Sequence, residues 1–342
     1  MILITGKEGI VHRTGKEIQN VFQNLFKQRG KWRREVKENL AKYYTGDAPR
    51  ATNERPIVVA MIDGKLKHGG LADRLRGIIS AYYVSRMYNR DFRIFFVHPF
   101  PLIDYLVPNL HDWRISEADL CFNNNDAEAM FCGSNATHVE RWFQEQWFKK
   151  RIKGMKRQLH IYTNAWLTRS GNTFQQCFNE LFRPSEALET ALDKAMQPLA
   201  GKEYFAVTLR FQQLLGDFKE DNYDVLPEAE RKLLMDRCVE QIAHIHTKMK
   251  VKKRILVTSD SSTFIDYAAS QLDYVYVVPG KLTHIDWATD IPFEMNLKSF
   301  VDLLMISRAQ KAFLLQTGKM YNSGFPRRAA QIGNVPFQHI RF

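Results

Sequence analysis

The chain has 342 residues, of which 45% are apolar and 12% aromatic, a composition typical of a folded protein with a sizeable core. Lysine and arginine outnumber aspartate and glutamate by 49 to 37, so the formal net charge is +12 and an anionic partner is favoured. No run of about 18 apolar residues predicts a membrane-spanning helix, and the four cysteines are too scattered for a zinc site or a disulfide framework.

Two blocks carry much of the positive charge, residues 27–42 and residues 149–157. One interpretation makes each block the solvated face of a helix. Other interpretations are a peripheral contact between these basic helices and an anionic membrane surface, or binding of acidic partners. Nucleic acid is not expected, because the sequence has no zinc finger, basic zipper or RNA-binding strand pattern. Because no secretory leader pattern is visible, we expect a cytoplasmic protein, with membrane-peripheral placement as the open alternative.

In chain order, a helix is predicted over residues 15–44 from its apolar spacing. A strand over 57–62 then leads through a glycine loop, residues 65–70, into a helix beginning at Leu71, and a second strand follows over 92–97. Gly69 and Gly70 allow the backbone to approach a ligand, and α/β proteins bind phosphate where a strand ends and a helix begins. The alternative is a plain turn with two surface arginines.

Strands and helices alternate in the second half, which predicts a parallel sheet covered on both faces. The strands are expected over 203–209, 254–258, 274–278 and 311–315, and the helices over 227–250, 262–272, 297–308 and 325–331. Two α/β halves imply a cleft between them. We expect a helical segment over residues 1–50, an α/β domain over 51–190 and a second, nucleotide-binding domain over 191–342.

Arg210 stands at the carboxyl end of a predicted buried strand, where a lone cation is costly unless an anion meets it. Its planar fork suits phosphate, but an internal ion pair with Asp217 or Asp260 is an equal alternative. Among the acids of the following loop, one could be a general base, although solvated loop acids are commoner. Asp260 stands between a strand and a helix, where a nucleoside site and an ordinary N-cap are both plausible.

The segment from Thr317 to Phe325 precedes the final short helix, so it is either a phosphate-binding turn or a loop with an N-cap. A metal site is not supported, since the first half has no acidic pair on a short loop beside a strand. His244 and His246 are two apart on a helix and face different sides. We therefore expect neither a metal nor another cofactor.

Four motifs in this order resemble the fucosyltransferase superfamily of the GT-B fold, which includes nodulation and core α-1,6-fucosyltransferases and protein O-fucosyltransferases. The stretch His68-Gly-Gly-Leu-Ala-Asp-Arg-Leu-Arg-Gly-Ile78 is similar to the glycine-rich loop of the family. Thr208-Leu-Arg-Phe211 is similar to its His-x-Arg motif, and Thr258-Ser-Asp260 to its Thr-Asp-Asp motif. Ser307-Arg-Ala309 and Ser323-Gly-Phe325 are similar to its final motif region.

The resemblance implies a fold of two Rossmann-like domains that face a central cleft, and it assigns roles to residues. Arg210 would neutralise the GDP leaving group, Asp217 would be the catalytic base and Asp260 would address the nucleoside. The remaining donor-binding residues implied by the motifs are Gly69, Gly70, Asp73, Arg74, Thr208, Ser323, Gly324 and Phe325.

The sequence also departs from the family motifs. Thr208 replaces the motif histidine, Ala72 stands where glycine is usual, and Asp217 lies one position out of register with the expected acid. Residues 100–200 have no match. The implied function is metal-independent, inverting transfer of fucose or a related sugar from GDP to a glycan or lipid-linked saccharide acceptor. A transferase using another nucleotide-sugar and a non-catalytic relative that binds a GDP-sugar are the alternatives.

Overall fold

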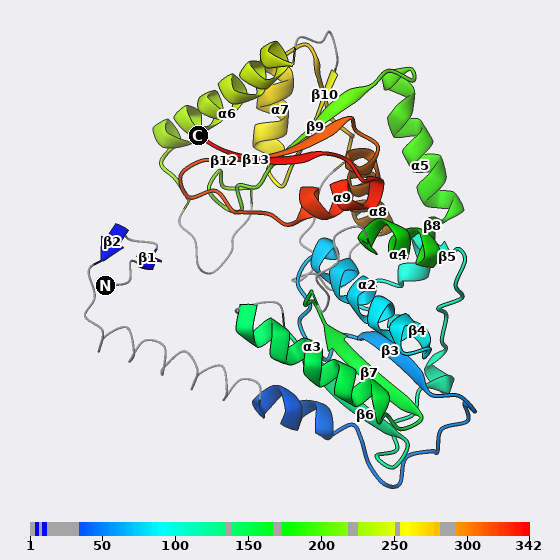
Figure 1. The fold of residues 1–342 in the computed structure, drawn as a ribbon. Coiled ribbons are helices and arrows are strands. Elements are labelled where there is room, and N and C mark those ends of the chain that lie inside the picture. The colour runs from blue at the N-terminus through cyan, green and yellow to red at the C-terminus, as the bar shows by residue number, and fades with distance from the viewer. Residues whose placement is uncertain are drawn as a thin grey trace.

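The computed structural model describes residues 4–6, 9–11, 34–133, 138–166, 173–217, 225–249, 254–280 and 292–342. Of the helix predicted over residues 15–44, residues 34–41 are helical and residues 15–33 lie outside the described parts. Two short strands, β1 (Ile4–Gly6) and β2 (Gly9–Val11), pair with each other. Most of the remaining strands form two parallel sheets, drawn one above the other in Figure 1, and β5 (Leu106–Pro108) and β8 (Phe182–Pro184) form a separate antiparallel pair.

The first sheet has four parallel strands in the order β4-β3-β7-β6. The strands are β3 (Ile57–Ile62), β4 (Asp91–Phe96), β6 (Ala127–Cys132) and β7 (Gln158–Thr163). Alternate residues of β3 point to opposite faces: Val58 and Ala60 join the apolar cluster of one face, and Val59 joins that of the other. Helices α2 (Leu71–Met87) and α3 (His138–Lys153) cover the first of these faces.

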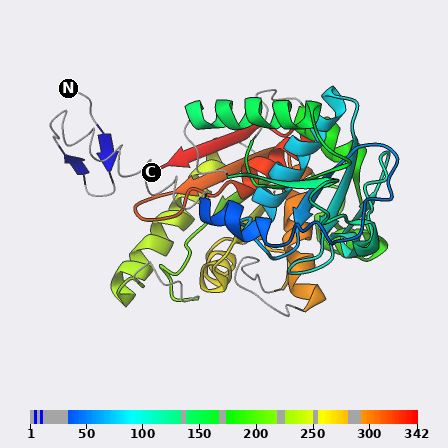
Figure 2. The same ribbon diagram turned by 90° about the horizontal axis from the view of Figure 1, so that it is seen from below.

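The other face of this sheet is covered by the chain that precedes it. Val36 and Leu40, from helical residues 34–41, pack on the sheet residues of that face. This helix and α3 therefore lie on opposite sides of the strands (Figure 2).

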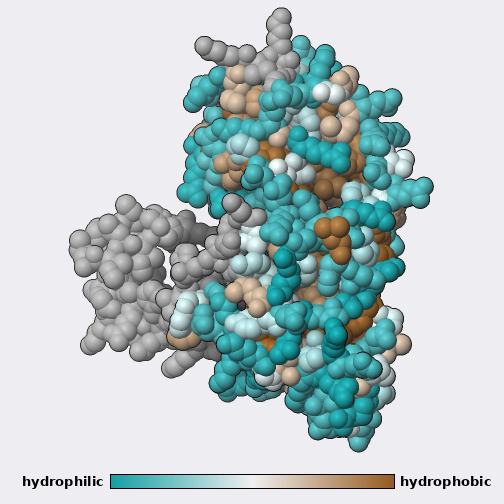
Figure 3. Space-filling view, turned by 45° about the vertical axis from the view of Figure 1, so that its right-hand side comes forward, coloured by the Kyte–Doolittle hydropathy of each residue, from teal (hydrophilic) through white to brown (hydrophobic). Residues whose placement is uncertain are grey.

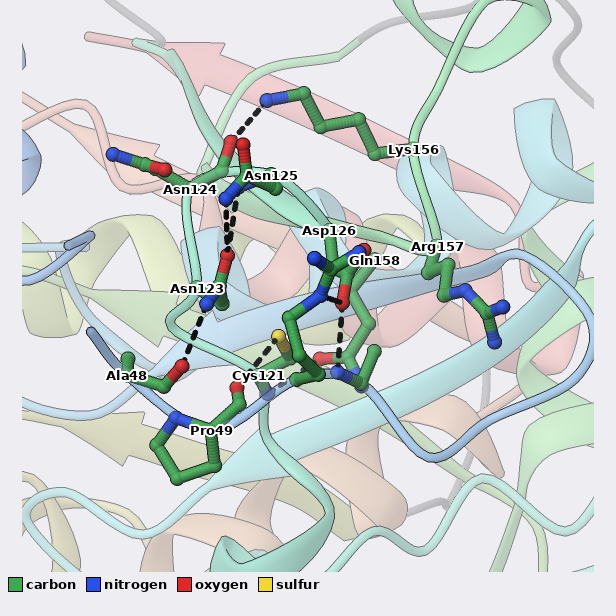
Figure 4. Close-up of polar contacts among 12 residues, drawn as sticks. Ala48, Pro49, Cys121, Asn123, Asn124, Asn125, Asp126, Lys156, Arg157 and Gln158 are labelled. Carbon is green, nitrogen blue, oxygen red and sulfur yellow. Dashed lines mark hydrogen bonds and ion pairs between the residues drawn. The ribbon is translucent and has the colours of Figure 1, made fainter. Parts of the chain in front are cut away.

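A turn at residues 123–126 fixes the preceding chain to the sheet edge. Asn123 donates its amide hydrogens to the carbonyl oxygen of Gly46, at 2.9 Å, and to that of Ala48, at 2.6 Å; Figure 4 shows the contact with Ala48. The carboxylate of Asp126 accepts from both Arg50 and the backbone N–H of Ala51. These contacts tie residues 46–51 to the first sheet.

The second sheet has five parallel strands in the order β11-β10-β9-β12-β13. The strands are β9 (Tyr204–Leu209), β10 (Arg254–Ser259), β11 (Val275–Tyr276), β12 (Lys311–Gln316) and β13 (Phe337–Arg341). Helices α6 (Glu228–Lys248) and α7 (Ser262–Gln271) pack on one face, and α8 (Phe293–Ser307) and α9 (Phe325–Gly333) on the other. The predicted parallel sheet with two covered faces is confirmed.

Apolar side chains join the two sheets into one continuous core. Helix α9 packs against α2 and α4 (Thr173–Leu181), and α5 (Glu186–Met196) packs against α8. The Tyr105 ring lies between Phe293 and Phe300, with ring centroids 4.8 and 4.6 Å away. Next to it, β5 (Leu106–Pro108) pairs with β8 (Phe182–Pro184). The boundary expected at residue 190 falls inside α5, which is part of this packing.

The surface in Figure 3 is mostly hydrophilic, with apolar residues in small areas. Within the described ranges, no helix combines the length and apolar character needed to cross a bilayer. The four cysteines are free and buried, and burial raises the pKa of the Cys177 thiol to about 11 and that of the Cys238 thiol to about 12. The Cys177 and Cys238 thiols are therefore protonated at neutral pH.

Gly77 allows α2 to cross the end of β7 at close range. A Cβ atom at this position would lie 2.0 Å from the carbonyl oxygen of Thr163. We expect Gly77→Ala to lower the free energy of unfolding by about 2 kcal/mol, because overpacking against the backbone outweighs the roughly 1 kcal/mol that alanine gains in a helix. Urea denaturation monitored by circular dichroism measures this change.

Gly154→Ala is the matched control, since its Cβ would meet no atom closer than 3.9 Å. The control should unfold at the same urea concentration as the parent or a higher one. Equal stability of Gly77→Ala and the parent would contradict the close approach of α2 and β7.

Candidate active site

The loop after β3 is held by a buried carboxylate. Asp63 accepts hydrogen bonds from the backbone N–H of Lys65, at 3.1 Å, and from the hydroxyl of Tyr162, at 3.0 Å. The Lys65 ammonium pairs with the same carboxylate at 2.5 Å. His68 is buried and stacks on Tyr162, and burial together with Arg74 lowers its pKa to about 4. His68 is therefore neutral at neutral pH and adds no charge to the loop.

Arg74 fixes the glycine loop to the loop after β4. Its Nε donates to the carbonyl oxygen of Gly69 at 2.8 Å, and a terminal nitrogen donates to that of His98 at 2.7 Å. Only 3% of Arg74 is exposed. Gly69 has a φ of +80°, and a Cβ atom there would lie 2.7 Å from the Asp73 carboxylate, so glycine is required for the turn. Gly70 precedes α2, and no side chain caps that helix.

Asp73 and Arg76 are the polar residues of α2 that face the second half of the chain. They form an ion pair at 2.8 Å, with 39% of the Asp73 side chain and 15% of the Arg76 side chain exposed. Arg76 also donates to the carbonyl oxygen of Asn164, at 2.7 Å. Both act electrostatically on Arg328 of α9, which shows that the starts of α2 and α9 lie close together.

Arg210 follows β9, the central strand of the second sheet, and 27% of its side chain is exposed. Its Nε lies 3.3 Å from the carboxylate of Asp260, which is the first residue after the neighbouring β10. The carbonyl oxygen of Arg210 accepts the N–H of Tyr321 at 2.9 Å. The loops after β9, β10 and β12 are thus joined at Arg210.

Both carboxylate oxygens of Asp260 are used inside this arrangement. They accept the backbone N–H groups of Phe211 and Gln212, at 2.8 and 2.7 Å. Gln212 has a φ of +55°, so these bonds stabilise a left-handed turn directly after Arg210. Burial raises the pKa of Asp260, while the Arg210 guanidinium and the two N–H groups act in the opposite direction.

Thr208 and Asp217 also make structural contacts. The Thr208 hydroxyl bonds to that of Thr258 across β9 and β10, at 2.7 Å, and both residues are buried. Asp217 accepts the hydroxyl of Ser261 at 2.6 Å, and also accepts from Ser262 and Thr263 at the start of α7. Burial raises the pKa of Asp217, but the hydrogen bonds led by that of Ser261 outweigh it, so the pKa lies below its usual value.

The start of α9 collects positive charge. Ser323 accepts the N–H of Phe325 at 3.2 Å, and Gly324 is the exposed N-cap. Arg328 lies over the rings of Trp166 and Phe174, and its Nε has no hydrogen-bond partner in the described structure. Burial, together with the nearby Arg76 and Arg327, lowers the pKa of Arg328 to about 10. Cations at a helix N-terminus oppose the helix dipole, so this position favours an anion.

The structure therefore brings the proposed residues of the second half together at the carboxyl edge of the second sheet. The glycine loop and Asp73 lie at the start of α2, on the first half of the chain. Arg76 and Arg328 were not among the proposed site residues. The sequence signal for Arg328 is a pair of arginines, 327 and 328, directly after the Ser-Gly-Phe-Pro start of a helix. No cluster of three or more histidine, cysteine, aspartate or glutamate side chains within the described ranges is placed to hold a metal ion.

Comparison with known proteins reveals the fold. No protein-family model matches the sequence, and no curated protein sequence is similar to it. Among solved structures, the NodZ α-1,6-fucosyltransferase soaked with GDP-fucose matches with a TM-score of 0.53 at 14% identity, over 85% of this chain and 95% of NodZ. A variant of Arabidopsis thaliana FUT1 in complex with GDP matches with a TM-score of 0.53 at 12% identity, over 89% of this chain and 74% of FUT1. The chain shares the GT-B fold of these fucosyltransferases, as the sequence motifs predict.

Asp217 gives a pH-dependent prediction. Its carboxylate is stabilised in the ionised form, so its contribution to stability is present above the usual aspartate pKa and is lost as the pH falls through the lower, folded-state value. Asp217→Asn should cost about 1 kcal/mol of unfolding free energy at neutral pH, as loss of a helix cap does. The difference between variant and parent should shrink below the usual aspartate pKa of about 3.9.

Thermal unfolding across this pH range measures the difference. Asp266→Asn, which changes an exposed aspartate of the same helix, should match the parent throughout. A stability difference for Asp217→Asn that is independent of pH would mean that the charge of Asp217 does not cap α7.

Proposed function

We propose that this protein is an inverting, metal-independent glycosyltransferase that moves fucose, or a related sugar, from GDP to a hydroxyl of a glycan or lipid-linked saccharide. The proposal is supported by the shared fold, since the matching structures were determined with GDP-fucose or GDP. It is also supported by the positions of Arg210, Arg76 and Arg328 in this chain.

Arg210 is the observation that carries the proposal. It combines a fixed backbone, a partly exposed guanidinium and a position at the carboxyl end of the central strand. Ligands of open α/β sheets bind at this edge. A guanidinium fork there can bind the two phosphates of a nucleoside diphosphate and neutralise the charge that develops as the sugar leaves.

The start of α9 would bind the same diphosphate from the other side. Arg328 and Arg76 place two cations close together across the junction of the two halves, and Gly324 and Phe325 open a helix whose N–H groups favour an anion. These fixed positive charges supply the stabilisation that a metal ion provides in other transferases. No further cofactor is needed in the proposed reaction.

The contacts change the roles proposed for three residues. Asp260 uses both carboxylate oxygens to hold the Arg210 loop, so we propose that it positions Arg210 and does not bind the nucleoside. Arg74 is buried under backbone contacts, so we propose that it shapes the glycine loop. Thr208 likewise supports the strand end through Thr258.

In inverting transfer the acceptor hydroxyl also loses a proton, and a carboxylate is one group that can accept it. Asp217 is a poor base, because several donors already bind its carboxylate and its pKa lies below the usual value. Asp73 is the other candidate: its carboxylate pairs with Arg76 at 2.8 Å, but its side chain is 39% exposed at the junction of the two halves. We propose Asp73 as the base that receives this proton.

Substitution of Arg210 tests the proposal. Arg210→Ala should weaken GDP binding roughly tenfold to a hundredfold and abolish sugar transfer, because charged hydrogen bonds contribute about 1.5–3 kcal/mol. Arg210→Lys, which keeps the charge but not the fork, should retain part of the GDP affinity. Calorimetry with GDP, and mass spectrometry of products formed from GDP-fucose and glycan acceptors, measure both effects.

Arg254→Ala is the matched control, since Arg254 is an exposed arginine at the opposite edge of the same sheet. It should bind GDP as the parent does. Tighter binding of UDP or ADP than of GDP would mean that the donor is a UDP-sugar or an ADP-sugar and not a GDP-sugar. GDP binding without hydrolysis or transfer would identify a non-catalytic protein that binds a GDP-sugar.

A further inference from the structure

Helix α3 carries an exposed cluster of aromatic side chains outside the candidate active site. Trp142, Phe143 and Trp147 are 46%, 60% and 41% exposed. The rings of Trp142 and Phe143 contact each other edge to face, with centroids 5.0 Å apart. Clustered exposed aromatic residues of this size are unusual on a soluble surface and indicate a face that something covers.

The inner side of α3 is already packed. Gln144 is buried, and Phe148 and Ile152 are fully buried against the first sheet. These positions recur every four residues and define the inward stripe of the helix. The aromatic cluster therefore faces outward on a helix that is fixed to the sheet, and its exposure is a property of the folded protein.

Cations follow the aromatic cluster along α3 and in the short loop after it. Residues 146–157 contain no carboxylate and six cations, which are Lys149, Lys150, Arg151, Lys153, Lys156 and Arg157. Lys149 is half-buried and the other five are exposed. Two of the six are paired, Lys149 with Glu145 at 2.6 Å and Arg151 with Glu128. No carboxylate in the described part of the chain pairs with Lys150 or Lys153. Both residues are exposed, and the Lys153 ammonium lies over the Tyr88 ring, 5.5 Å from its centroid.

An exposed aromatic cluster followed by exposed cations fits the surface of an anionic membrane. The distance along the helix from Trp142 to Lys153 is about 16 Å at 1.5 Å per residue, so aromatic and cationic groups can meet one surface together. Tryptophan and phenylalanine partition into the headgroup region of a bilayer, and lysine and arginine are attracted to its anionic lipids. The net charge of +12 adds long-range attraction to the same surface.

We propose that α3 docks this protein on an anionic membrane, with Trp142, Phe143 and Trp147 among the headgroups and the cations of residues 149–157 against lipid phosphates. The docking surface is separate from Arg210 and does not depend on the proposed transfer reaction. Because α3 follows the carboxyl end of β6, its aromatic half begins at the sheet edge that bears the glycine loop (Figure 1). Docking along α3 would place this edge beside the lipid surface.

Sedimentation of the full chain with vesicles tests the proposal. We expect binding to an equimolar mixture of phosphatidylcholine and phosphatidylglycerol, and much weaker binding to phosphatidylcholine alone. Combined Trp142→Ser, Phe143→Ser and Trp147→Ser should lower the partition coefficient by roughly tenfold or more, since bound apolar area is lost. Lys150→Gln with Lys153→Gln should lower it about 25-fold, given about fivefold per cation.

Matched controls separate docking through α3 from non-specific adsorption of the protein to vesicles. Leu110→Ser with Leu233→Ser removes apolar side chains that are 79% and 60% exposed elsewhere. Lys202→Gln with Lys248→Gln removes the same charge from exposed sites in the second half. Both controls should bind vesicles as the parent does, and all variants should share its thermal unfolding midpoint, because every changed side chain is exposed.

Three results would overturn the proposal. The first is anionic-vesicle binding that survives loss of the aromatic cluster, which would reduce the effect to net charge. The second is an equal loss of binding in the control variants. The third is self-association that the aromatic substitutions abolish while vesicle binding is absent, which would show that a second copy of the chain covers α3.

Discussion

The buried carboxylate of Asp260 is the contact on which the candidate site depends. A buried charge is costly unless it is paired and hydrogen-bonded, and Asp260 meets this requirement with Arg210 and with two backbone N–H groups. The same contacts fix the left-handed turn at Gln212 and bring the end of β9 to the end of β10. The Arg210 guanidinium is thereby directed by the backbone of two strands, with little freedom left to lose when an anion binds.

Positive charge at the junction of the two halves follows from this arrangement. Arg76 and Arg328 lie close enough that each disfavours the charge of the other, and burial adds to the cost. Asp73 pairs with Arg76 and offsets part of this repulsion, and an anion bound at the junction would offset more of it. The continuous apolar core through α2, α4, α8 and α9 holds both halves against this repulsion.

The sequence predicted the elements whose pattern is local. β3 has the predicted bounds because six consecutive apolar residues lie between turn residues, and α7 begins at the expected Ser262. It did not predict β7, where Gln158 and His160 are fully buried inside an apolar sheet. The two side chains bond to each other, but their other partners include Asn53 and Tyr44, more than a hundred residues away in sequence, so no local pattern could reveal that both are fully satisfied.

The candidate site shows the same division between local and distant information. The sequence identified Arg210 and left its partner open between Asp217 and Asp260. Geometry separates the two: Asp260 pairs with Arg210, and Asp217 is occupied at the start of α7. Arg328 was not identified from the sequence, because its proposed role depends on its proximity to Arg76, which lies in another part of the fold.

Helix α3 connects the charge of the chain to its architecture. The block at residues 149–157 could be only the solvated face of a helix, and most of its cations are indeed exposed. What solvation alone does not explain is the aromatic half of the same helix, since water favours neither Trp142 nor Phe143 at its surface. An interface that is apolar at one depth and anionic at another accommodates both halves at once. That physical match, and not the net charge alone, distinguishes α3 from the other exposed cations of this protein.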